Sequence, residues 1–196
     1  MKPIVFFDFD GVLCFDKYWR SLPNEQYLQV QELMFGNDKT RIKDWMIGRY
    51  TAEEINQYIA AETGIPYETL WRVFVYDCKN MEVSKSILER ISELRERYIT
   101  ILITGNMDSF TRFTVPALKL YLYFDHINNS YFAEKQKLDE GGILFSQYAQ
   151  KLDVPLKKCT LMDDSAKNCE VFRSLGGTAY QITSEKTVSE YLGQLD

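Results

Sequence analysis

The chain has 196 residues, of which 45% are hydrophobic and 26% charged, and this predicts one globular domain or one domain with a sizeable insertion. Because 28 Asp and Glu outnumber 23 Lys and Arg, the net charge is −5, and no summed positive field would attract a nucleic-acid backbone or an anionic membrane. The apolar runs are far shorter than the ~20 residues of a membrane span. We therefore expect a soluble, cytoplasmic protein without a secretory signal, and neither nucleic acid nor a membrane as a partner.

The cysteine and histidine content limits the chemistry available to the protein. The four cysteines, at positions 14, 78, 159 and 169, show no C-x-x-C spacing, and we expect reduced thiols. Cys14 has no histidine near it in the sequence and is expected to fill apolar space. The sequence has a single histidine, His126, and this excludes most zinc centres and catalytic triads, which need imidazole groups. His126 is expected to be structural. If the protein is an enzyme, carboxylates must carry the reaction.

The first third of the chain predicts a buried strand followed by a helical segment. Residues 4–7 form a continuous apolar run, which is typical of a strand in a parallel sheet, and Asp8, Asp10 and Gly11 follow it. Amphipathic helices are expected over residues 27–35, 43–46 and 52–61. All three tryptophans lie between residues 14 and 81. They are expected to fill the core of a small helical subdomain, with substrate contact by one of them as the alternative.

From residue 82 onward, helices and strands are expected to alternate. Asp108 is expected to be the N-cap of the second helix of this part. The expected helices are 83–97, 108–119, 142–152, 166–175 and 186–195, and the expected strands are 98–103, 124–128, 159–162 and 178–182. This order predicts an α/β fold, a doubly wound (Rossmann-like) parallel sheet interrupted once by a small all-helical insertion.

Three of the expected strands end in polar clusters: Asp8-x-Asp10-Gly11, Thr104-Gly105-Asn106 and Asp163-Asp164-Ser165. In open α/β sheets, ligands bind beyond the carboxyl ends of the strands, so these clusters should meet in one crevice. Four neighbouring carboxylates would repel one another unless a divalent cation joined them. Oxygen ligands without histidine or cysteine favour Mg²⁺, which commonly binds substrate phosphate as well. The residues alone therefore predict a Mg²⁺-dependent phosphate site.

The order of these clusters, with a lysine between the second and the third, resembles the four motifs of the haloacid dehalogenase (HAD) superfamily. The resemblance covers nearly the whole chain. It implies a core domain made of residues 1–13 and 82–196, and a helical cap made of residues 14–81. The stretch from Ile47 to Pro66 is similar to the cap that family members insert after the first motif.

The resemblance implies a role for each residue of the first motif. Asp8 would be the nucleophile that attacks phosphorus and forms an aspartyl-phosphate, and it would also ligate Mg²⁺. Asp10 would protonate the leaving oxygen, later deprotonate the attacking water, and ligate Mg²⁺ through its backbone carbonyl. Dehalogenating members of the superfamily lack the second aspartate, so Asp10 argues for phosphate chemistry.

The second and fourth motifs would bind phosphate and metal. Thr104 would bind a phosphoryl oxygen together with the backbone N–H groups of Gly105 and Asn106, although a strand-to-helix cap is the alternative role of Thr104. In the fourth motif, Asp164 would ligate Mg²⁺ directly, and Asp163 would act through a water or through the catalytic lysine. Ser165 would bind phosphate. Asn168 is expected to hold the turn that precedes the next helix.

The third motif and the cap leave more alternatives open. The stretch Glu134–Ile143 lacks the prolines that often follow this motif's lysine, and Lys137 is the better match while Lys135 remains possible. Either lysine would offset charge on Asp8 and on the phosphoryl group. Among the cations of the cap, Lys17 and Arg20 are the candidates for gripping the leaving group.

The favoured function is a Mg²⁺-dependent phosphatase of a small phosphorylated metabolite, with the cap excluding bulk water. A phosphomutase or phosphotransferase would use the same nucleophile, because the acceptor is chosen by the shape of the cap. A non-catalytic, phosphate-binding regulatory domain is the alternative from another class. The specific substrate and the oligomeric state cannot be deduced from the sequence.

Overall fold

The computed structural model describes residues 2–195, and its central feature is a five-stranded parallel sheet. The strand order is β3-β2-β1-β4-β5, which confirms the expected doubly wound α/β architecture. The strands are β1 (Ile4–Phe7), β2 (Ile99–Thr104), β3 (His126–Asn129), β4 (Cys159–Asp163) and β5 (Thr178–Gln181). The first and last residues of the expected core, 1 and 196, lie outside the described residues.

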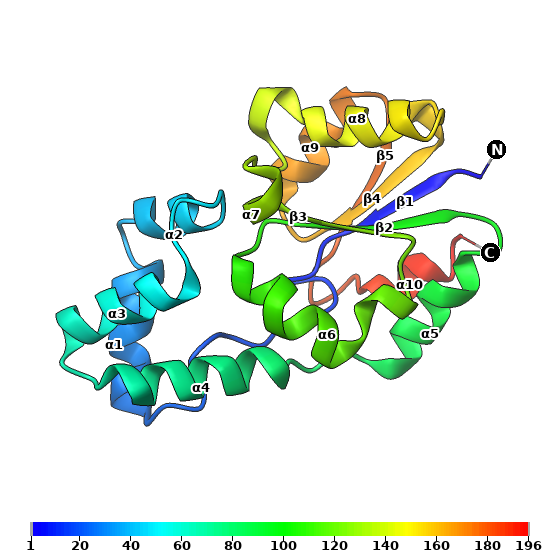
Figure 1. The fold of residues 1–196 in the computed structure, drawn as a ribbon. Helices are drawn as coiled ribbons and strands as arrows, with labels where there is room; N and C mark the ends of the chain where they lie inside the picture. The colour runs from blue at the N-terminus through cyan, green and yellow to red at the C-terminus, as the bar shows by residue number, and fades with distance from the viewer. Residues whose placement is uncertain (1, 196) are drawn as a thin grey trace.

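Helices cover both faces of the sheet (Figure 1). Alternate residues of β1 point to opposite faces, so Phe6 packs with Phe145 and Phe172 on one side, and Phe7 packs with Phe124 on the other. The helices of the Phe6 side are α8 (Ile143–Lys151) and α9 (Ala166–Ser174), and those of the opposite side include α5 (Lys85–Leu94) and α10 (Val188–Leu192). All four residues of β1 are buried because helices cover both faces of the sheet, and this explains why the strand is a continuous apolar run in the sequence.

Shorter helical segments complete this part of the chain. A π-helical turn, η1 (Phe110–Thr114), leads into α6 (Val115–Leu118), where Pro116 has no N–H to donate. The remaining segments are η2 (Leu120–Leu122), α7 (Ser130–Ala133), η3 (Asp139–Gly141) and η4 (Leu156–Lys158). Among the described residues, no helix has both the length and the apolar character needed to cross a membrane.

Four helices between β1 and α5 form a separate group beside the sheet (Figure 1). They are α1 (Asn24–Phe35), α2 (Thr40–Trp45), α3 (Ala52–Thr63) and α4 (Tyr67–Lys79), and we call them, with their connections, the insertion. Trp19, Trp45 and Phe74 pack together at its centre, with Trp71 against Phe74 at the edge of this group. The tryptophans therefore pack in the insertion, as expected, while α4 was not among the expected helices.

Asp108 connects the sheet-bearing part of the chain to the insertion. Its buried carboxylate accepts hydrogen bonds from Trp45 Nε1 (2.8 Å) and the Ala52 backbone N–H (3.3 Å), and it pairs with Arg112 (2.7 Å). Arg112 in turn pairs with Glu53 at the start of α3. The expectation that Asp108 caps its own helix is therefore wrong, because its carboxylate satisfies donors of the insertion instead.

Replacing Asp108 with Ala should lower the free energy of unfolding by about 3 kcal/mol, since the Trp45 and Ala52 donors would stay buried without acceptors. Urea denaturation measures this loss. Glu53→Ala is the matched control, because it removes only the half-exposed partner of Arg112 and should cost within about 1 kcal/mol. Equal losses for the two variants would contradict a buried connection through Asp108.

Candidate active site

The polar clusters predicted from the sequence meet at one edge of the sheet. Strand β1 lies between β2 and β4, with Phe7 paired to Leu102 and to Met162. Asp8 directly follows β1, while Thr104 and Asp163 are the last residues of β2 and β4. Because these three strands are parallel neighbours, their carboxyl ends bring the three side chains together, as expected from the topology.

Lys137 is the cation at the centre of this cluster. Its buried ammonium lies 2.5 Å from Asp8 Oδ2 and 2.6 Å from Asp163 Oδ2. Lys135, the other candidate, points elsewhere and pairs with Glu140 at 2.5 Å. The structure therefore places Lys137, and not Lys135, beside the expected nucleophile.

Asp163 is held from several sides, which suits an orienting role. Besides Lys137, Asn168 Nδ2 donates to both of its carboxylate oxygens, at 2.9 and 3.0 Å, and the Ser165 backbone N–H donates to Oδ1 at 2.9 Å. Asn168 thus does more than hold a turn. The Ser165 hydroxyl accepts from the Asn168 backbone N–H and caps α9. Its own hydrogen stays available to donate, so the expected contact with phosphate stays a prediction.

Three carboxylates form a group that fits a divalent cation. Oxygens of Asp8, Asp163 and Asp164 all lie within 4.8 Å of one another. Such an all-oxygen donor set is the kind that Mg²⁺ prefers. Gly11, at φ +75°, makes room for this arrangement, because a Cβ there would collide with the Asp164 carboxylate. The Asp10 carboxylate does not belong to this group, and metal ligation by its backbone carbonyl stays a prediction.

Asp10 is instead tied to the loop after β2. Asn106 Nδ2 donates to Asp10 Oδ2 at 2.7 Å, and Tyr18 donates from its hydroxyl to Asn106 Oδ1 at 2.8 Å. The backbone N–H of Asn106 donates to Ser130 Oγ at 2.9 Å. The expectation that this N–H binds phosphate is therefore wrong for this structure, because Ser130 already accepts its hydrogen.

Tyr18 and Ser130 are site residues that sequence reasoning missed. Ser130 begins α7 directly after β3, so the rule about the carboxyl ends of strands could have found it. Its hydroxyl also donates to the Met46 carbonyl of the insertion at 2.7 Å. Tyr18 carries no comparable signal, because only the folded connection to the insertion brings it to Asn106.

Thr104 presents a free hydroxyl to this edge of the sheet. Its Oγ1 is buried, and within residues 2–195 it has no hydrogen-bond partner. A buried hydroxyl without a partner is costly unless a ligand completes it, so Thr104 fits the expected contact with a phosphoryl oxygen. Gly105 follows directly, with Gln136 and Met46 packed so closely that a Cβ at position 105 would lie 3.1 and 3.3 Å from them. Phosphate binding by the Gly105 N–H stays a prediction.

The environment raises the pKa of both carboxyl groups of the first motif. Burial, reinforced by the Asp163 charge, raises the pKa of Asp8 to about 6 although Lys137 opposes the change. Burial and the Asp8 charge raise the pKa of Asp10 to about 7, against the smaller opposing effects of Lys17 and Lys137. A carboxyl group with this pKa can hold a proton near neutral pH and release it, as a general acid and base must.

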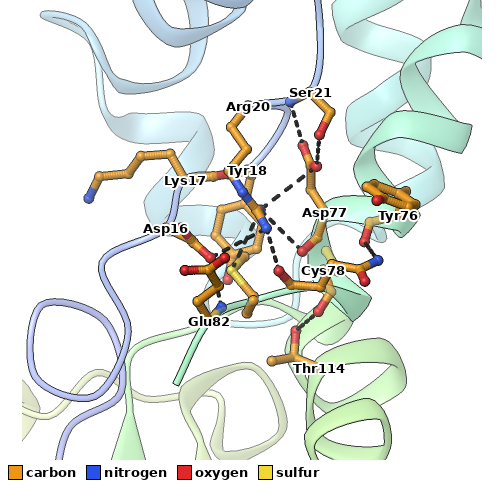
Figure 2. Close-up of polar contacts among 12 residues, drawn as sticks. Asp16, Lys17, Tyr18, Arg20, Ser21, Tyr76, Asp77, Cys78, Glu82 and Thr114 are labelled. Atoms are coloured by element: carbon orange, nitrogen blue, oxygen red, sulfur yellow. Dashed lines mark hydrogen bonds and ion pairs between the residues drawn. The ribbon is translucent and has the colours of Figure 1, made fainter. Parts of the chain in front are cut away.

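Arg20 and Lys17, the two cations expected to grip the leaving group, differ in their contacts (Figure 2). Arg20 donates to the backbone carbonyls of Asn80 (2.5 Å) and Asp77 (3.2 Å), and it pairs with Asp16 (3.3 Å). It therefore clamps together the two connections of the insertion, and its expected role in gripping a leaving group is wrong. The Lys17 side chain extends away from this clamp.

Lys17 lines a cavity of about 320 Å³ between the insertion and the sheet. Asp10 and Gly105 belong to the same lining, so the cavity opens beside the expected general acid and the loop after β2. The rest of the wall is mostly apolar or already hydrogen-bonded: Asp16, Tyr18, Gln31, Phe35, Ile42, Met46 and Met107. Lys17 therefore stays a candidate for gripping a leaving group, as expected from the sequence.

The remaining reactive side chains take no part in the site. The four cysteines are free and buried, and burial raises the pKa of Cys14 to about 12, which confirms its expected inert role. His126 lies on β3 with its ring 6.0 Å from that of Tyr148, away from the acidic cluster. The charged groups that gather at this edge of the sheet are therefore carboxylates and Lys137.

Comparison with known proteins agrees with this arrangement. Residues 3–176 match the family model described as haloacid dehalogenase-like hydrolase. The chain belongs to this family. No curated protein matches the sequence. The fold is similar to a HAD family enzyme from Bacteroides thetaiotaomicron, solved with magnesium and inorganic phosphate, at 18% identity and a TM-score of 0.69 over 97% of this chain and 99% of that one.

Two further solved structures show the breadth of the family. A protein from Porphyromonas gingivalis described as a predicted HAD-like family hydrolase aligns at 18% identity with a TM-score of 0.71, over 100% of this chain and 98% of that one. The L-2-haloacid dehalogenase from Xanthobacter autotrophicus, solved with chloropropionic acid covalently bound, aligns at 13% identity with a TM-score of 0.64, over 95% and 80%. Since fold does not determine function, these similarities leave the reaction to be argued from the site.

The raised pKa of Asp10 makes the stability of this HAD-like hydrolase pH-dependent. The unfolded chain loses the Asp10 proton near pH 4, roughly the ordinary value, whereas the folded chain keeps it until about pH 7. In between, the unfolded state binds fewer protons, so the free energy of unfolding falls as the pH rises.

With EDTA present, the wild type should lose stability relative to Asp10→Asn between pH 4 and 7, by up to about 4 kcal/mol, with a constant difference above that range. The Asn amide keeps an acceptor for Asn106 but cannot titrate. Urea denaturation of both proteins across this range measures the difference. A difference that does not vary with pH would contradict a buried, titrating Asp10.

Proposed function

We propose that this HAD-like hydrolase is a Mg²⁺-dependent phosphatase that acts on a small phosphorylated metabolite. One observation carries the proposal: a second carboxyl group, Asp10, is held by Asn106 at the cavity next to the Asp8–Lys137 pair. An alkoxide leaves phosphorus readily only if it receives a proton, whereas a halide leaves carbon without one. A poised acid at this position therefore favours cleavage of a phosphate ester over cleavage of a carbon–halogen bond.

The reaction follows from the roles of the side chains. A carboxylate oxygen of Asp8 attacks phosphorus and forms an aspartyl-phosphate, while the bond from phosphorus to the ester oxygen breaks and Asp10 protonates that oxygen. The deprotonated Asp10 then takes a proton from a water that attacks the phosphorus of the intermediate. Inorganic phosphate leaves, and both carboxyl groups return to their starting states.

The other residues bind charge and hold the reactants. The Lys137 ammonium balances the negative charge that gathers on Asp8 and on the transferring group. The Thr104 hydroxyl, whose partner is missing, and the Gly105 N–H would bind phosphoryl oxygens. Asp8, Asp163 and Asp164 would hold Mg²⁺, with the Asp10 carbonyl as a further ligand. When bound, Mg²⁺ supplies positive charge that offsets the repulsion between the phosphate and these carboxylates.

The insertion would act as the cap, made of residues 14–81, and would complete the substrate cavity. A volume of about 320 Å³ is about ten times the share of one water molecule, which suits a small leaving group. Lys17 is the cation of the cavity wall that would meet an anionic or hydrogen-bonding leaving group. The net charge of −5 disfavours a nucleic acid or an anionic membrane as a partner, and we propose that the protein acts in the cytoplasm.

Mg²⁺-dependent release of inorganic phosphate from an aryl phosphate and from a panel of metabolite phosphates tests the proposal. Wild type should release phosphate with Mg²⁺ but not with EDTA, and Asp8→Asn should lose at least about 10³-fold of the rate, because the amide cannot attack phosphorus. Lys137→Ala should lose at least about 100-fold. Lys135→Ala is the matched control and should keep wild-type turnover, since within residues 2–195 Lys135 pairs with Glu140 and not with the acidic cluster.

The alternatives give different results in the same assay. An isomerised sugar phosphate without free phosphate would indicate a phosphomutase, and chloride release from 2-chloropropionate would indicate a dehalogenase. Mg²⁺ binding without any turnover would indicate a regulatory domain. Full activity of Asp8→Asn would contradict the mechanism itself.

A further inference from the structure

The orientation of the Asn106 amide is determined by a backbone group. The Met107 N–H donates to Asn106 Oδ1 at 3.0 Å, and an N–H group can only donate. The oxygen of the amide must therefore face Met107, which turns the Nδ2 hydrogens toward Asp10 Oδ2 at 2.7 Å. Asn106 is fully buried, so no exchange with bulk solvent competes with these contacts. The amide cannot flip without leaving the Met107 donor unpaired.

This fixed amide distinguishes the two oxygens of Asp10. Oδ2 accepts a hydrogen from Asn106, so a proton on this carboxyl group belongs on Oδ1. Asp10 would therefore donate its proton from Oδ1, in the direction in which that oxygen points. A carboxyl group free to rotate would lack that preference, and the transfer of its proton would have to wait for the correct orientation.

Tyr18 completes the chain of hydrogen bonds from the side of the insertion. Its hydroxyl donates to Asn106 Oδ1 at 2.8 Å, and its ring is buried against Trp19 and Phe74. Gln31, on α1 of the insertion, donates to the Tyr18 carbonyl at 3.2 Å. The insertion therefore positions the hydroxyl that helps to hold Asn106, and Asn106 positions Asp10.

We propose that Tyr18 and Asn106 are positioning residues that orient Asp10 for proton transfer to the leaving oxygen, and that Tyr18 ties this orientation to the placement of the insertion. The proposal rests on the proposed phosphatase function. Neither residue exchanges a proton with the substrate. The hydrogens stay on the Tyr18 oxygen and the Asn106 nitrogen, and the only proton that moves is the one between Asp10 and the leaving oxygen.

The dependence of the rate on the leaving group tests this role. Protonation by Asp10 matters greatly for alkyl phosphates, whose alkoxides are strongly basic, and little for p-nitrophenyl phosphate, whose phenolate is stable. The loss of kcat/KM caused by Tyr18→Phe should therefore grow with the basicity of the leaving group, and should be at least about threefold larger for ethyl phosphate than for p-nitrophenyl phosphate. A residue that merely shapes the cavity would not produce this slope.

Further variants separate positioning from folding. Asn106→Leu keeps a similar volume but removes the donor to Asp10, so it should steepen the same dependence. In an Asp10→Asn background, Tyr18→Phe should no longer change the slope, because the acid it positions is absent. Tyr76→Phe is the matched control, since this tyrosine is 58% exposed on α4, and its slope should equal that of the wild type.

These experiments distinguish a failure of the positioning role from a failure of the proposed phosphatase function. If turnover depends on Mg²⁺ and Asp8 but Tyr18→Phe and Asn106→Leu both cause equal losses for all leaving groups, the positioning role is overturned and the phosphatase remains. A Tyr18→Phe slope that persists in the Asp10→Asn background would also overturn it. Failure of the wild type to release phosphate from any ester would overturn the proposed function and this inference together.

Discussion

The site depends on one buried cation held between two carboxylates. Lys137 neutralises charge on Asp8 and Asp163, which stand at the ends of the neighbouring strands β1 and β4. Buried ions of this kind are tolerated only when paired, so removing the lysine would leave two uncompensated charges at the edge of the sheet. Adding Asp164 makes the cluster negative overall, which explains why its oxygens suit a divalent cation. Burial raises the pKa of Asp164.

The loop after β2 joins this charged centre to the insertion. Asn106 holds Asp10 and is itself held by Tyr18 and Ser130, and Ser130 donates to the Met46 carbonyl of the insertion. Asp108, two residues further on, accepts from Trp45. One short segment thus binds the acid and the insertion together. The arrangement gives a physical reason why the position of the insertion and the orientation of Asp10 should change together.

Much of the fold and part of the site could be predicted from the sequence. The apolar run of β1 and the polar residues after each strand indicated the sheet and its functional edge, because parallel strands end at the same edge. Helix α4 was not indicated, since its β-branched and aromatic residues are typical of strands. The choice of Lys137 over Lys135, the use of Arg20 as a clamp and the contact of Tyr18 with Asn106 depend on which residues the folded chain brings together. Local pattern carries no information about such pairings.

Detection of a phosphoryl group on Asp8 is the most direct test of the account. Asp10→Asn should slow the second step more than the first with an activated aryl phosphate, because its amide cannot deprotonate the attacking water. After mixing with p-nitrophenyl phosphate and Mg²⁺ and quenching in acid, mass spectrometry of the peptide that contains Asp8 should show one added phosphoryl group. The same peptide from Asp8→Asn should show none. Phosphate release by wild type without any labelled Asp8 in the trapped variant would contradict the aspartyl-phosphate mechanism.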